Sequence, residues 1–236
     1  MCSILIFLLI TNPCVTLTQK IPSEDAQEKI RAAQVADCFI DVFRKTLDFG
    51  VAWKTFRLSD PSCTHRANGM LGQKDYERLK LSGRTVERLY VAVMNYYYLM
   101  AVYELSLERL DSQSDSEKSK TPGRAELIQK RSKFFQNDDR EPQNVKEVEE
   151  LIGTLEQLAA EYRKHIPKGA MKSSAWRANQ KYLITRSGMD HEDMLNGDET
   201  FCVPQRTRVY VIDRGIFYFY IVEERGKMKV AGLGID

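Results

Sequence analysis

One stretch, residues 84–110, constrains this chain most, because it predicts a long helix that is apolar around most of its circumference. Apolar residues recur there at three- and four-residue steps along one seam, namely Leu89, Val93, Tyr96, Met100, Tyr103, Leu107 and Leu110. Between Leu89 and Tyr103 only Asn95 is plainly polar. A helix of this kind must be covered either by the rest of the chain or by lipid.

Length and tyrosine content favour a protein environment for this helix. The apolar stretch 89–103 covers about 22 Å at 1.5 Å per residue, short of the roughly 30 Å of a bilayer's hydrocarbon core. Tyr96, Tyr97, Tyr98 and Tyr103 also carry hydroxyl groups that need partners when they are buried. We therefore expect a central helix surrounded by protein, and no transmembrane segment in the mature chain.

The end of the chain predicts an antiparallel sheet. Three runs rich in β-branched and aromatic residues, 209–212, 216–222 and 228–233, are separated by turns that contain Gly215 and Gly226. The middle run is apolar on both faces, so we expect it to be covered on both sides.

Further helices are predicted before and after the central one. The first begins at Ser23, carries an apolar stripe from Ile30, and ends near Gly50. Others are expected over 73–81, 124–135 and 145–166. The predicted fold class is α+β, with a helical body of about four helices packed on a C-terminal three- or four-stranded antiparallel sheet.

This order of elements is loosely similar to that of the cone-shaped nuclear-transport-factor-2-like class, which includes both enzymes and binding modules. The similarity is one of order only. The long helical stretch 84–166 departs from the usual pattern of the class, and no motif residue carries over. The resemblance therefore assigns no family.

Residues 1–18 are typical of a signal peptide. They contain no Asp, Glu, Lys or Arg, and residues 4–10 form an apolar run too short to span a bilayer. Thr16 and Thr18 suit cleavage before Gln19, although no basic residue precedes the run. We expect export to the periplasm or secretion, with 19–236 forming a single domain. The alternative is a buried N-terminal strand or helix.

Composition predicts one flexible linker and one disulfide. Residues 112–123 are rich in Ser, Lys and acidic residues, so burial cannot offset the entropy of ordering them. After cleavage the cysteines are Cys38, Cys63 and Cys202. Cys63 and Cys202 lie in polar, loop-like surroundings and are the expected pair in an oxidising compartment. Cys38 lies in a helical pattern and is expected to be a small buried hydrophobe.

The sequence predicts no catalytic, cofactor or metal site. Lys plus Arg total 35 and Asp plus Glu total 33, a balance that gives no support to nucleic-acid binding. The chain has no Gly-rich phosphate loop, no dinucleotide fingerprint and no zinc-binding His or Cys motif. Among the histidines, His191 lies in an acidic, loop-like run, and we interpret that run as a solvated loop.

Aromatic residues supply the one candidate binding site. A pocket between the long helix and the sheet would be lined by Asn95, Tyr96, Tyr97, Met100, Tyr103, Tyr218 and Tyr220. The alternative is an aromatic core with satisfied hydroxyls. The expected function is that of an exported non-catalytic protein that binds a small apolar ligand or a protein partner. The alternatives are an enzyme with an enclosed aromatic pocket and a carboxylate acid/base, and a structural envelope protein.

Overall fold

The computed structural model describes residues 24–59, 73–111, 127–129, 132, 142–167, 182–186 and 208–234. The fold is α+β, as predicted. The helices are α1 (Glu24–Thr46), α2 (Phe49–Phe56), α3 (Gln73–Leu79), α4 (Gly83–Asp111) and α6 (Val145–His165). The strands are β1 (Tyr182–Arg186), β2 (Arg208–Arg214), β3 (Phe217–Glu224) and β4 (Lys227–Gly234).

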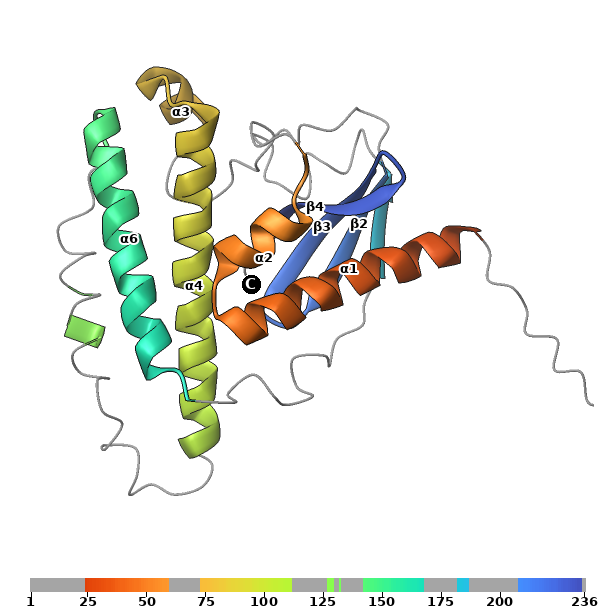
Figure 1. Ribbon diagram of the computed structural model, residues 1–236, viewed down its shortest axis with the longest axis horizontal. Helices are drawn as coiled ribbons and strands as arrows, with labels where there is room; N and C mark the ends of the chain where they lie inside the picture. The colour runs from red at the N-terminus through yellow and green to blue at the C-terminus, as the bar shows by residue number, and fades with distance from the viewer. Residues whose placement is uncertain are drawn as a thin grey trace, which may run out of the picture.

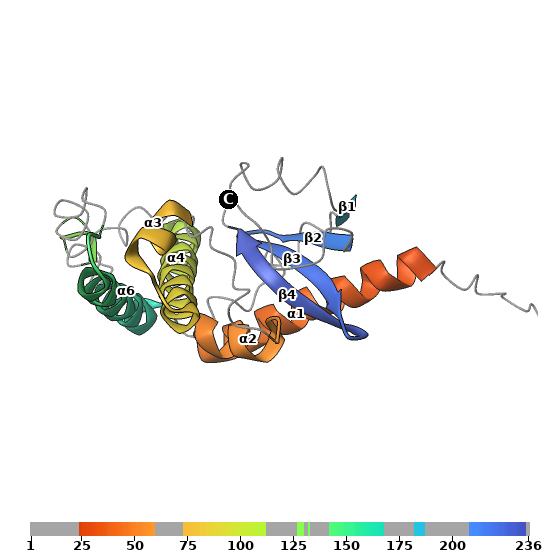
Figure 2. The same ribbon diagram turned by 90° about the horizontal axis from the view of Figure 1, so that it is seen from above.

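The four strands form one antiparallel sheet in the order β1-β2-β3-β4. Helices α1 and α2 lie across one face of this sheet, and α4 stands beside it with α6 on its far side (Figures 1 and 2). Helices α4 and α6 run in the same direction, since Arg88 near the start of α4 pairs with Glu149 near the start of α6 at 2.7 Å. The prediction of a central helix surrounded by protein is confirmed, because α4 buries side chains on all sides of its axis.

The first helix is shorter than predicted, and a separate helix follows it. Helix α1 ends at Thr46 because Leu47 adopts a positive φ of 49°, which turns the chain out of the helix. Asp48 then caps α2, its Oδ1 accepting a hydrogen bond from the Val51 amide at 3.2 Å. The prediction of one helix ending near Gly50 is therefore wrong. Gly50 instead allows α2 to approach α4, since a Cβ there would lie 3.1 Å from Val91.

The buried face of α1 is narrower than the apolar pattern indicated. Helix α1 turns Ala32, Ala36, Phe39 and Phe43 toward the core, where each is 0% exposed. Two residues on other sides of the helix are exposed, and both predictions of burial were wrong: Ile30 is 46% exposed and Cys38 is also exposed. The sheet covers one side of α1, and the sequence pattern does not show how much of the circumference a single sheet can cover.

Both faces of the sheet are buried, as predicted for its middle strand. On the face toward the helices lie Tyr210, Ile212, Phe217, Phe219 and Ile221. On the other face lie Val209, Val211, Tyr220, Val222 and Ala231, and Leu58 packs with them. The register shifts between Tyr220 and Ile221, so that β4 contributes one extra residue at this point.

The predicted meander is confirmed, and β1 adds the fourth strand. The turns have positive φ at Gly215 (75°), Arg225 (51°) and Gly226 (75°), the conformations that two-residue hairpin turns require. Strand β1 pairs with β2 from Tyr182 opposite Ile212 to Arg186 opposite Arg208. The sequence did not assign β1, because its run of apolar residues is too short to distinguish a strand from a loop.

Several predictions lie outside the described residues. They are the signal peptide 1–18, the pairing of Cys63 with Cys202, the linker 112–123 and the acidic loop around His191. Of the predicted helix 124–135, residues 127–129 and 132 are described, and they are helical. Among the helices described, none has the length and hydropathy that a membrane span requires.

Two glycine substitutions test this backbone. Gly153 lies within α6, and a Cβ there would meet nothing within 4 Å, so Gly153→Ala should raise the free energy of unfolding. We expect a gain of about 0.5–1 kcal/mol from the lower entropy of the unfolded chain. Gly215→Ala should cost about 1 kcal/mol or more, because its φ of +75° disfavours a side chain. Urea unfolding measures both, and a loss of stability in Gly153→Ala would contradict the open space found around this helical position.

Candidate functional site

Aromatic rings from four elements meet at the junction of the helices with the sheet. The Tyr98 ring of α4 stacks on Phe217 of β3, with ring centroids 4.3 Å apart, and on Phe49 of α2, with ring centroids 5.6 Å apart. Trp53 of α2 lies 4.9 Å from Tyr90 of α4, and Phe39 of α1 lies 5.3 Å from Phe219 of β3. All of these rings are buried. The cluster confirms an aromatic core, and its rings are used to pack elements together.

Two phenols of this core bind the backbone of β4, the edge strand of the described sheet. The Tyr90 hydroxyl accepts a hydrogen bond from the Leu233 amide, and the Tyr98 hydroxyl donates one to the Gly234 carbonyl, both at 3.0 Å. An edge strand otherwise leaves such groups unpaired. Burial raises the pKa of both phenols well above the ordinary value, so both are neutral at physiological pH. Their role is to fasten α4 to the sheet.

Asn95, the polar residue within the apolar stretch of α4, forms a hydrogen bond that joins α4 to α2. Its Oδ1 accepts a hydrogen bond from the Phe49 amide at 3.0 Å, one of the free donors at the start of α2. Arg163 of α6 binds the same corner, with its Nε donating to the Leu47 carbonyl at 2.7 Å and its Nη2 lying 3.4 Å from Asp48 Oδ2. The corner between α1 and α2 is thus held by both α4 and α6.

The other residues of the predicted ligand site fall into two groups. Tyr96 and Tyr103 pack against Tyr162 of α6, with ring centroids 5.8 and 5.5 Å from the Tyr162 centroid. Tyr97 lies 5.2 Å from Tyr96 and, like Met100, is half-buried. These α4 residues lie together, but several of them face α6 instead of the sheet.

The second group lies on the sheet. Tyr218 and Tyr220 contact each other at 5.9 Å and belong to the apolar cluster on the far face of the sheet from α1. The structure therefore does not gather the predicted residues around one space between α4 and the meander. Helix α4 turns by about 100° per residue, so neighbouring tyrosines face different partners. The sequence shows the seam but not which neighbour each tyrosine meets, and ligand binding by these residues stays a prediction.

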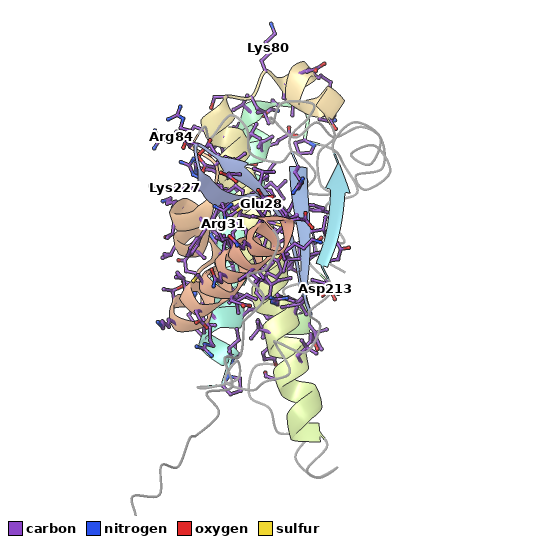
Figure 3. All side chains as sticks on the ribbon, turned by 90° about the vertical axis from the view of Figure 1, so that its right-hand side faces the viewer. Glu28, Arg31, Lys80, Arg84, Asp213 and Lys227 are labelled. Carbon is purple, nitrogen blue, oxygen red and sulfur yellow. The ribbon has the colours of Figure 1, made fainter. Side chains whose placement is uncertain are left out.

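A cluster that the sequence analysis missed lies where α1 crosses β2. We call Asp25, Glu28, Arg208 and Tyr210 the α1–β2 polar cluster. Arg208 Nη1 lies 3.0 Å from Asp25 Oδ1 and 2.7 Å from Glu28 Oε2, and the Tyr210 hydroxyl donates a hydrogen bond to Glu28. Figure 3 shows Glu28 on α1, where this helix crosses the sheet. The side chains of Arg208 and Asp25 are 37% and 48% exposed, so solvent reaches the cluster.

Charge and hydrogen bonding define what this cluster can do. Burial and the hydrogen bond to Glu28 raise the pKa of Tyr210 from 10.0 to about 12, so the phenol is a neutral donor at physiological pH. Arg208 supplies a guanidinium and Tyr210 supplies a hydroxyl, and both groups donate hydrogen bonds to a carboxylate. The sequence carried only a weak signal, namely acids one turn apart at 25 and 28 and polar residues alternating at 208 and 210.

Other charged side chains in the described part also join distant elements. Arg214, only 3% exposed, pairs with Asp37 of α1 at 2.8 Å. Arg57 pairs with Glu87 of α4 at 2.8 Å, and the same carboxylate accepts a hydrogen bond from Trp53 at 3.2 Å. Within the described residues, no three His, Cys, Asp or Glu side chains gather in a way that could hold a metal ion.

Comparisons of the chain with models of protein families, with curated proteins and with solved structures find no match.

The role of Asn95 in the fold is tested by Asn95→Leu, which removes the acceptor for the Phe49 amide. We expect the free energy of unfolding to fall by about 1–3 kcal/mol, the cost of a buried donor left without a partner. Gln157→Leu on the exposed side of α6 is the matched control and should change stability by less than about 0.5 kcal/mol. Equal stabilities of the two variants in urea unfolding would argue against this role.

The pKa of Tyr210 predicts how stability changes in alkali. A group whose folded pKa is raised stabilises the fold fully below its unfolded value of 10.0, and this contribution is lost as the pH rises toward about 12. Tyr210→Phe should therefore be less stable than the wild type at pH 8, and the difference should shrink between pH 10 and 12. Urea midpoints across this range measure the difference. A constant difference would show that the hydroxyl does not titrate in this way.

Proposed function

We propose that this protein is an exported, non-catalytic interaction protein that binds a protein partner. The observation that carries the proposal is that charged side chains of the described residues pair with one another across different elements. Carboxylates that meet cations from distant segments, such as Glu28, Glu87 and Asp37, join one element to another. Acid–base catalysis instead requires a titratable group aimed at a substrate.

Packing of the aromatic rings supports a protein partner over a small apolar ligand. A ligand site between α4 and α6 would need space beside Tyr96 and Tyr103, but both rings contact Tyr162 edge to face. These contacts are favourable ring geometries that a ligand would have to replace. A protein partner can bind the outer surface and leave this packing in place.

Export rests on the composition of residues 1–18, which suits a cleaved leader. The full chain produced in a host with a secretory pathway should yield a mature protein that begins at Gln19. Intact mass and N-terminal sequencing measure this directly. A non-reducing peptide map of the same material should show Cys63 joined to Cys202. Mature protein that retains Met1 would contradict the export part of the proposal.

Partner binding is tested with the purified full chain and envelope proteins of the organism that encodes it. We expect a purified partner to bind saturably at a fixed stoichiometry, and heat-unfolded protein to serve as the non-binding control. Melting temperatures with panels of lipids and sterols form the second arm, because a ligand that binds only the folded state raises them. A concentration-dependent rise with a sterol or lipid, without a saturable protein partner, would favour the small-ligand function instead.

A further inference from the structure

The first two turns of α1 are held to the sheet differently from the rest of the helix. From Ala32 onward, α1 buries alanine and phenylalanine side chains in the core. None of residues 25–31 is buried, and Ile30 is 46% exposed. These turns are joined to the sheet by polar contacts, through the α1–β2 polar cluster and through Arg31, whose Nη2 lies 3.5 Å from Glu223 on β3.

Strand β2 supplies the donors for these contacts from a single face. Arg208 and Tyr210 are two residues apart, so both project toward α1, and both bind the carboxylate of Glu28. Arg208 Nη1 also donates to Asp25. A guanidinium beside a neutral phenol provides strong, charge-assisted hydrogen bonds to an anion and offers nothing comparable to a cation.

We propose that Arg208 and Tyr210 form a carboxylate-binding site that α1 occupies with its own Asp25 and Glu28, and that an acidic segment of a partner protein takes their place. The site rests on the proposed interaction function and names the chemistry of the partner. Displacement requires only residues 25–31 to leave the sheet, because the buried side chains from Ala32 onward keep α1 anchored. The first turns of α1 thus act as an internal competitor for the partner.

The experiment measures binding of fluorescein-labelled hexaglutamate to the full chain by anisotropy at fixed ionic strength. D25N/E28Q removes the internal competitor and should bind at least tenfold more tightly than the wild type. R208M/Y210F added to that background should abolish the gain. The matched control is E149Q/E150Q on α6, which makes the same change in net charge and also frees two cations, Arg88 and Lys146, from their partners.

Each outcome decides the proposal. Equal gains in D25N/E28Q and E149Q/E150Q would show attraction by net charge and overturn the site, as would no gain in D25N/E28Q. If D25N/E28Q loses its far-UV circular dichroism, E28Q alone and hydrogen exchange of the wild type replace it. Hexaglutamate should then lower the protection of residues 25–31, and unchanged protection would overturn the site. A natural partner that still binds R208M/Y210F would leave the proposed function standing without this site.

Discussion

The contact between α4 and the sheet holds the described fold together. Helix α4 is covered on all sides, yet it meets the sheet mainly through the buried rings of Tyr90 and Tyr98. These phenols pair with the last backbone groups of β4, while the Tyr98 ring stacks between Phe49 and Phe217. The same two side chains thus supply apolar packing and satisfy the edge of the sheet, which lets α2, α4 and β3 share one core.

Polar side chains at the ends of the elements complete this arrangement. Asn95 and Arg163 bind the corner between α1 and α2 from two different helices, and Arg214 joins Asp37 at the hairpin end of the sheet. A buried guanidinium such as that of Arg214 is expensive to desolvate, so its carboxylate partner fixes where α1 crosses β2. The apolar core provides most of the stability, and these contacts specify the geometry.

Local patterns in the sequence predicted the elements, and contacts between distant segments account for most of what they missed. The period of α4 and α6 and the glycine turns of the meander are local, so the α+β class followed from them. The break at Leu47 did not, because a leucine with positive φ leaves no mark in composition. The α1–β2 polar cluster was missed for a related reason: Glu28 and Tyr210 are far apart in the sequence, and neither residue alone indicates the other. The tyrosine seam was found, but its neighbours depend on the direction from which α6 approaches.

The residues that follow α2 contact the last two strands, which lie far from them in the sequence. The Ser59 hydroxyl donates to Glu224 at 2.6 Å, and the backbone of Arg57 forms an isolated parallel β-bridge with Val230 of β4. Contacts between such distant segments require a large loop to close before they contribute anything, which slows folding. The helices can begin to form as they are synthesised, whereas α1 and α2 cannot be covered until strands β2 to β4 have left the ribosome. Until then the apolar faces of both helices are open to chaperones, which bind transiently exposed hydrophobic surface.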